Sequence, residues 1–198
     1  HSNAALVRRF SREARALSRI TSEHVVSIFD YGILPDGFPF FVMDLLRGQT
    51  LRALLQAERE LTVVRASNLG IDVCLGLAAA HQAGLVHRDL KPENLWQTRR
   101  DDGREACVLL DFGVAQVDGT HTTGDGALVG TARYMSPEQA SGMTRETDHR
   151  SDIYSVGVML FEMLTGDVPF RGNLRAILHQ KILEDPPSPR TLDAGIPR

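Results

Sequence analysis

Cysteine and long apolar runs are both scarce in this sequence, and their scarcity argues against two classes of protein. The chain contains two cysteines in 198 residues. Cys74 and Cys107 lie in apolar surroundings without the spacing of metal ligands, so we expect buried, reduced thiols in a cytosolic setting and no disulfide framework. No apolar run approaches the roughly 18 residues of a membrane span, and no signal peptide is recognisable at His1. We therefore expect no membrane segment within these residues.

A strong charge of either sign is lacking as well. The chain has 22 Lys and Arg against 25 Asp and Glu, a formal net charge of −3. Such a balance gives no general attraction to nucleic acid or to an anionic membrane, and we expect neither as a partner. The hydrophobic share of 42% is that of an ordinary globular protein, and the length suits one domain with a sizeable core.

Two short motifs carry residues suited to phosphoryl chemistry: His-Arg-Asp-Leu-Lys-Pro-Glu-Asn at residues 87–94 and Asp-Phe-Gly at residues 111–113. Asp89 can accept a proton from an alcohol, and Lys91 can neutralise charge on a phosphoryl group in transfer. Asn94 and Asp111 supply oxygen ligands of the kind that Mg²⁺ prefers. Phosphoryl transfer depends mainly on positioning and on compensation of negative charge, which these groups can provide.

Both motifs resemble the catalytic loop and the Asp-Phe-Gly signature of eukaryotic-type protein kinases. Residues 130–138, Gly-Thr-Ala-Arg-Tyr-Met-Ser-Pro-Glu, resemble the substrate-docking segment of the serine/threonine branch, and Gln139 is typical of its bacterial members. The resemblance covers nearly the whole chain. It implies a bacterial eukaryotic-like (Hanks-type) serine/threonine protein kinase that uses ATP and Mg²⁺ to phosphorylate protein substrates on serine or threonine, with autophosphorylation of its activation loop.

The resemblance also implies an α+β, bilobal, protein-kinase-like fold. Residues 1–43 would be a remnant of the amino-terminal lobe, residues 44–47 the hinge, and residues 48–198 a mostly helical carboxy-terminal lobe. The family's first three strands, its Gly-rich phosphate loop and its ATP-binding lysine would lie before His1. We therefore expect these residues on their own to have little or no kinase activity and an open sheet edge.

Apolar periodicity and turn residues predict the local elements. The predicted elements are helices over residues 3–20, 51–57, 62–83, 152–165 and 174–182, a strand hairpin over 25–45, a strand over 108–110, and a loop over 114–129. In the first helix, Glu13 is the residue that the resemblance pairs with the ATP-binding lysine. Asp152, at the start of a buried helix, matches the family aspartate that holds the backbone of the catalytic loop.

The nucleotide site is implied by the resemblance. Met43 would stand at the back of the adenine pocket, and the backbone of residues 44–46, including Asp44 and Leu46, would bind adenine. Trp96 departs from the family pattern, in which a smaller apolar residue forms the floor beneath adenine. Two alternatives remain: the indole stacks on adenine with its N–H reaching solvent, which we favour, or it crowds the pocket.

The docking segment and the loop before it would carry the substrate-binding and regulatory residues. Thr131 would hydrogen-bond to Asp89 and Lys91 and leave room for a serine or threonine hydroxyl. The candidate phosphorylation sites in the loop are Thr120, Thr122 and Thr123. Arg88 would offer its guanidinium to a phosphothreonine there and so order the loop.

Two other functions remain open at this point. An ATP-impaired pseudokinase or scaffold is favoured by Trp96 and by the amide of Gln97, but the complete motifs at 87–94 and 111–113 argue against it. A small-molecule kinase shares the chemistry but lacks the docking segment of residues 130–138. For the kinase, we expect a cytoplasmic domain. Any membrane anchor or sensor would lie outside this sequence, and a homodimer of the parent protein is a further expectation.

Overall fold

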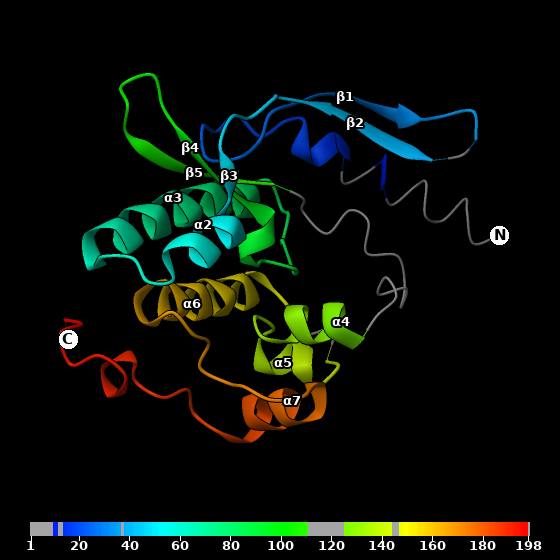
Figure 1. Ribbon diagram of the computed structural model, residues 1–198. Coiled ribbons are helices and arrows are strands. Elements are labelled where there is room, and N and C mark those ends of the chain that lie inside the picture. The colour runs from blue at the N-terminus through cyan, green and yellow to red at the C-terminus, as the bar shows by residue number, and fades with distance from the viewer. Residues whose placement is uncertain (1–9, 12–13, 37, 111–124, 144–146, 198) are drawn as a thin grey trace.

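The computed structural model describes residues 1–198 except 1–9, 12–13, 37, 111–124, 144–146 and 198. Figure 1 shows a strand hairpin at one end of the molecule and a larger part built mainly of helices. This arrangement confirms the predicted α+β, bilobal, kinase-like fold with a reduced strand-bearing part.

The smaller part consists of a short helix and an antiparallel hairpin. Strand β1 (Ile28–Ile33) pairs with β2 (Pro39–Met43), as the sequence predicted. Helical residues at 10–11 and 14–17 lie beside the hairpin. Phe10 is buried and packs on Phe41, with ring centroids 4.8 Å apart. This aromatic contact joins the helix to the hairpin.

The larger part follows after residues 44–48. Its elements are β3 (Gln49–Thr50), α2 (Leu51–Glu58), α3 (Val63–Gln82), η1 (Pro92–Asn94), β4 (Leu95–Arg99), β5 (Glu105–Leu109), α4 (Asp125–Ala132), α5 (Pro137–Ala140), α6 (His149–Thr165), α7 (Leu174–Leu183) and η2 (Pro189–Thr191). Strands β3, β4 and β5 form one antiparallel sheet in that order.

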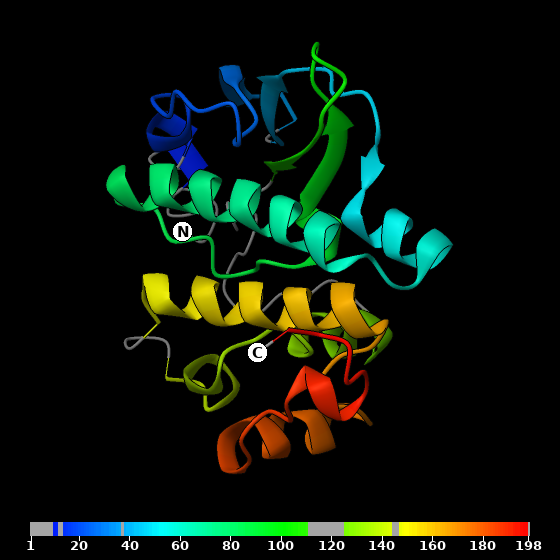
Figure 2. The ribbon, with the colours of Figure 1, turned by 90° about the vertical axis from the view of Figure 1, so that its left-hand side faces the viewer.

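Helices α3 and α6 form the centre of this part and lie one above the other in Figure 2. Helix α3 begins where Thr62 caps it, with the side-chain oxygen accepting from the backbone N–H of Arg65, and it ends before Gly84, whose φ is 76°. Helix α6 ends at Gly166 in the same left-handed conformation. Because both helices are fixed at their ends and buried along one face, they form a rigid base for the segment that passes between them (Figure 2).

Several predicted details are wrong. Residues 125–129 were predicted as loop but belong to α4, whose residues 128–132 are half-buried or buried. Ile153 and Ile182, apolar positions in the predicted helices over 152–165 and 174–182, are 51% and 46% exposed. Cys74 is exposed on α3, whereas Cys107 is buried as predicted, and both are free thiols. The sequence shows where apolar residues recur along a helix, but the elements that pack against the helix determine which of these residues are buried.

Helix α3 is, among the residues described, the one helix long and apolar enough to cross a membrane by length and composition. This finding differs from the expectation that no such segment exists. In the structure its inner face, which includes Leu69, Val73 and Leu77, lies in the hydrophobic core against α6 and β5. Core helices pass the same composition test, so this packing accounts for the apolar sequence.

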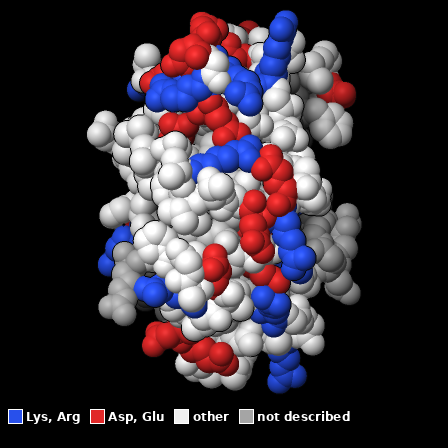
Figure 3. Space-filling model, turned by 60° about the vertical axis from the view of Figure 1, so that its left-hand side comes forward, with Lys and Arg blue, Asp and Glu red and all other residues white. Residues whose placement is uncertain are grey.

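Positive and negative side chains are interspersed on the face shown in Figure 3. Arg65 lies between two carboxylates: its Nη2 is 2.7 Å from Glu105, and its Nη1 pairs with Glu58. Arg100 pairs with Glu23 and so joins the β4–β5 turn to the segment before β1. Arg100 and Glu105 thus connect the stretch 99–105 to its neighbours.

Lys181 on α7 is a buried cation. Its side chain is 2% exposed, and Nζ lies 4.7 Å from the ring centroid of Tyr154 and 5.6 Å from that of Phe170. Burial lowers the pKa of Lys181 to about 8, because the charged form is poorly solvated there. The two aromatic faces offset part of this cost while the ammonium is charged.

We predict that Lys181→Met changes how stability depends on pH. Between pH 8 and 10.5 the unfolded chain binds more protons at Lys181 than the folded chain, so stability rises with pH in this window. Urea denaturation should therefore show the wild type gaining up to about 3 kcal/mol relative to Lys181→Met between pH 7.5 and 10.5. Parallel curves for the two proteins would contradict the lowered pKa.

Candidate active site

The catalytic-loop motif is held by the buried carboxylate of Asp152. Its Oδ1 accepts from the backbone N–H of Arg88 at 2.8 Å, and its Oδ2 accepts from the N–H of His87 at 2.9 Å. His81 Nε2 lies 2.8 Å from the same Oδ2. Asp152 is 1% exposed and lies in the first turn of α6, where the helix dipole favours a negative charge. The predicted role of Asp152 in holding the loop backbone is confirmed.

Arg88 has an uncommon backbone conformation. Its φ of 66° lies in the left-handed region, which costs about 1 kcal/mol for a residue with a side chain. Its N–H is held by Asp152, and its carbonyl accepts from Gln139 Nε2 at 2.7 Å. Two helices, α6 and α5, therefore hold both polar groups of this residue, and the residue that follows it is Asp89.

Asp89, Lys91 and Thr131 meet at one point. Lys91 Nζ donates to Asp89 Oδ2 at 2.9 Å and to Thr131 Oγ1 at 3.2 Å. The predicted contact of Thr131 with Lys91 is confirmed. Contrary to the prediction, no hydrogen bond joins Thr131 to Asp89 within the described part of the chain, because the Lys91 ammonium bonds to both. Asp89 Oδ1 is buried and has no hydrogen-bond partner among these residues.

Asn94 is fixed by its own amide nitrogen. Its Nδ2 donates to the carbonyl of Asp89 at 2.8 Å, which leaves Oδ1 as the remaining ligand atom of the carboxamide. The carbonyl of Asn94 accepts from the N–H of Leu110 at 2.9 Å. Leu110 directly precedes Asp111. This bond therefore holds the chain just before the second motif close to Asn94.

The donor set of this site fits Mg²⁺. Asn94 Oδ1 is a hard oxygen atom, the class of ligand that Mg²⁺ takes. Asp111, the other predicted metal ligand, lies outside the described residues. Over the ranges that the structure describes, no three His, Cys, Asp or Glu side chains form a metal-binding group.

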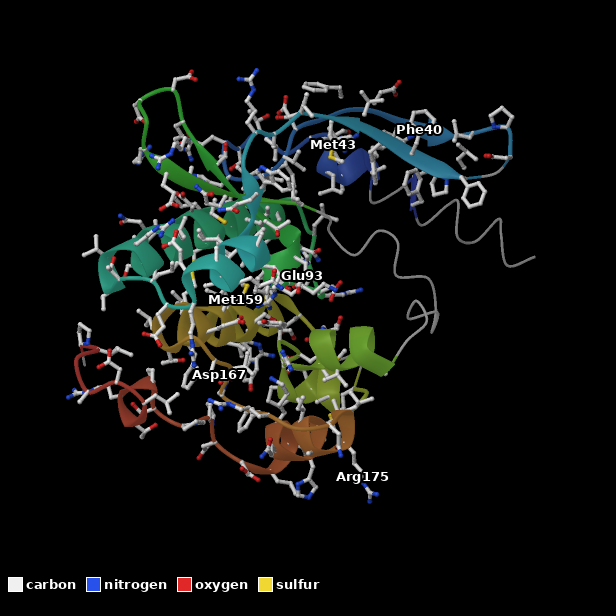
Figure 4. All side chains as sticks on the ribbon, viewed as in Figure 1. Phe40, Met43, Glu93, Met159, Asp167 and Arg175 are labelled. Atoms are coloured by element: carbon white, nitrogen blue, oxygen red, sulfur yellow. The ribbon has the colours of Figure 1, made fainter. Side chains whose placement is uncertain are left out.

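The predicted hinge connects β2 to β3. Met43 ends β2 opposite Ile28 and is 47% exposed, and Figure 4 shows it above Glu93 of the catalytic loop. The N–H of Asp44 donates to the carbonyl of Ser27 at 3.1 Å. Leu46 is half-buried, and both residues lie outside helices and strands, between β2 and β3. The adenine contacts of Met43, Asp44 and Leu46 therefore stay predictions.

Trp96 lies in the three-stranded sheet, opposite Thr50 on β3 and Val108 on β5. Successive side chains of a strand point to opposite faces of its sheet. Leu95 faces the hydrophobic core, so the indole of Trp96 lies on the opposite face of the sheet. The expectation that its N–H reaches solvent is wrong: Nε1 is buried and has no partner among the described residues. A Cβ at Gly48 would lie 3.2 Å from Nε1, so the indole packs against the chain that leaves the hinge.

Several predicted residues cannot be placed. Glu13, Asp111, Thr120, Thr122 and Thr123 lie outside the described residues. Arg88 is described, and its side chain is exposed, with no ion pair to any residue in the described ranges. A phosphothreonine partner for it therefore stays a prediction.

Sequence reasoning missed a charged network around Arg52. From α2, Arg52 pairs with Glu93 of the catalytic loop at 2.9 Å and with Glu162 of α6 at 2.7 Å. It also donates to the hydroxyl of Tyr134, which in turn donates to Glu162 Oε2 at 2.6 Å. Burial and the charge of Glu162 raise the pKa of Tyr134 well above its usual range, so the phenol keeps its proton. No local pattern announces these contacts, since the partners are far apart in sequence.

Comparison with known proteins agrees with this geometry. Residues 1–193 match the model of the protein kinase domain. The chain belongs to the protein kinase family. Its relatives place this kinase domain with the bacterial Hanks-type serine/threonine kinases: it is 42% identical to serine/threonine-protein kinase PknL of Mycobacterium tuberculosis over 192 residues and 40% identical to serine/threonine-protein kinase pkn3 of Myxococcus xanthus over 195.

The kinase domain accounts for only part of each relative. Each of these matches covers 96% of this chain, but 46% of PknL and 35% of pkn3. The match to the probable serine/threonine-protein kinase PknB of Corynebacterium glutamicum, 39% identical, covers 95% of the chain and 29% of that protein. The chain thus spans less than half the length of these relatives.

We predict that Asp152→Ala unfolds the protein more easily and loosens the catalytic loop. The substitution leaves the N–H groups of His87 and Arg88 and the ring of His81 without their acceptor, so the free energy of unfolding should fall by about 3 kcal/mol. Urea denaturation measures this loss. Asp148→Ala, which removes the side chain that caps the start of the same helix, is the matched control and should cost clearly less. Equal losses would contradict the role of Asp152.

Proposed function

We propose that the protein containing this kinase domain transfers the γ-phosphate of ATP to serine or threonine hydroxyls of other proteins. The observation that carries the proposal is the geometry at Asp89: one carboxylate oxygen is bonded to Lys91, and the other is buried without a partner in the described part of the chain. An unpaired, buried carboxylate oxygen is costly unless a ligand group bonds to it. A substrate hydroxyl is the group that the family's chemistry supplies.

In this proposal Asp89 orients the hydroxyl and takes its proton as the oxygen bonds to the γ-phosphorus. The bond from that phosphorus to the bridging oxygen breaks, and ADP leaves. Lys91, held at 2.9 Å from Asp89 and 3.2 Å from Thr131, compensates negative charge on the phosphoryl group. Thr131 belongs to the docking segment, so its bond to Lys91 links the place where a substrate would lie to the reacting groups.

Asn94 and Asp111 are the residues that would hold Mg²⁺. The ion supplies charge neutralisation on the phosphates when bound. The orientation of Asn94 supports this assignment, because its nitrogen is already used by the Asp89 carbonyl. Met43, Asp44 and Leu46 are the proposed adenine-binding residues, and Glu13 the proposed partner of the ATP-binding lysine. We propose a cytoplasmic location for catalysis, where ATP is present and the free thiols stay reduced.

The test is Asp89→Asn in the full-length protein. We expect phosphorylation of a protein substrate to fall by at least about 100-fold, because the amide cannot accept the proton. The expected result includes unchanged thermal unfolding, since the two side chains have the same shape. Transfer is measured with radiolabelled ATP.

Asp102→Asn is the matched control for that test. Asp102 is exposed in the β4–β5 turn, where its carboxylate accepts from the N–H of Arg104. Its substitution makes the same chemical change and should leave turnover as in the wild type. Turnover retained in Asp89→Asn, or lost equally in both variants, would overturn the proposed role of Asp89.

The position of Trp96 gives a second test, of the nucleotide site. If the indole stacks on adenine, its emission changes when MgATP binds, and the wild-type signal minus that of Trp96→Phe isolates this one residue. We expect quenching that saturates with ATP concentration. An unchanged difference signal in a protein that still phosphorylates substrate would show that adenine does not contact the indole.

A further inference from the structure

Gln139 uses both ends of its side chain to join two parts of the proposed active site. Its Oε1 accepts from the N–H of Ser136 at 3.0 Å and from the Ser136 hydroxyl at 3.2 Å. Together with the Ser136 side chain, this forms a capping box at the start of α5. Its Nε2 points the other way and donates to the carbonyl of Arg88 at 2.7 Å. One half-buried amide thus binds the end of the docking segment and the catalytic loop.

The Arg88 carbonyl is a sensitive point of attachment. It belongs to the peptide group that leads directly into Asp89, so its direction fixes where the Asp89 side chain starts. Arg88 has a φ of 66°, a conformation that a residue with a side chain keeps only when its surroundings hold it. Asp152 holds the N–H side of this residue from α6. Gln139 holds the carbonyl side from α5.

The docking segment is connected to the same place by other bonds. Thr131 accepts from Lys91, and the carbonyl of Tyr134 accepts from Ser155 of α6 at 2.8 Å. A small hollow between the loop and the segment, about 10 Å³ in volume, is lined in part by Asp89, Thr131 and Gln139. Movement of the segment therefore changes the position of the amide that holds Arg88.

We propose that Gln139 is a positioning residue that makes the orientation of Asp89 depend on the seating of the docking segment. The inference rests on the proposed kinase function. Ser136 uses the oxygen of the amide and the Arg88 carbonyl uses its nitrogen, so the amide acts through the Arg88 carbonyl. Its effect therefore falls on the catalytic step, whereas binding of ATP at the other side of the loop is unchanged.

Gln139→Glu in the full-length protein tests this inference. The carboxylate keeps an oxygen for Ser136, so the capping box remains, but it cannot donate to the Arg88 carbonyl and repels it. We expect kcat to fall about ten- to a hundredfold with the KM for ATP unchanged. Hydrogen exchange should become faster in the peptide that covers residues 85–91 and stay unchanged in α3.

Gln56→Glu is the control, because Gln56 is exposed on α2 and its substitution adds the same charge. It should leave both kcat and exchange as in the wild type. The inference is overturned if Gln139→Glu behaves like this control, if exchange rises while kcat holds, or if exchange rises throughout the molecule. If the wild-type protein transfers no phosphate, the proposed kinase function is wrong. The hydrogen exchange of residues 85–91 in Gln139→Glu would still show whether Gln139 holds the catalytic loop.

Discussion

The carboxylate of Asp152 is the charge on which the rest of this structure depends. It lies almost fully buried between α3 and α6, where an unpaired charge would be strongly destabilising. Its hydrogen-bond donors are the backbone of the catalytic loop and the ring of His81. The loop therefore cannot rearrange without leaving this charge uncompensated, and the position of α6 determines where the reacting groups lie.

The remaining site groups are arranged relative to that fixed loop. Asn94 bonds back to the Asp89 carbonyl, and the chain entering the second motif bonds to Asn94. Lys91 joins Asp89 to the docking segment. Backbone groups thus supply much of the geometry, and side chains supply the chemistry. Phosphoryl transfer suits such a design, because it needs placement and charge compensation more than covalent help.

The sequence predicted those structural features that depend on only a few neighbouring residues. The cap at Thr62, the stop at Gly84 and the pairing of β1 with β2 follow from the preferences of single residues. Family motifs located the site because they fix residue types at short spacing. The use of Gln139 was out of reach, since its acceptor lies 51 residues earlier and no pattern links the two. The exposure of Ile153 and the buried N–H of Trp96 depend on neighbours that only the folded chain brings together.

The network around Arg52 has a consequence for how mutations combine. Arg52, Tyr134 and Glu162 each bond to the other two, so removing one leaves the remaining pair with fewer hydrogen bonds and a different solvation. Effects within such a triangle do not add, because the second substitution acts on a site that the first has already altered. The losses of stability measured for the three single alanine variants would overlap, because each variant breaks bonds that it shares with the other two. Double-mutant cycles are needed to divide the interaction free energy among the three side chains.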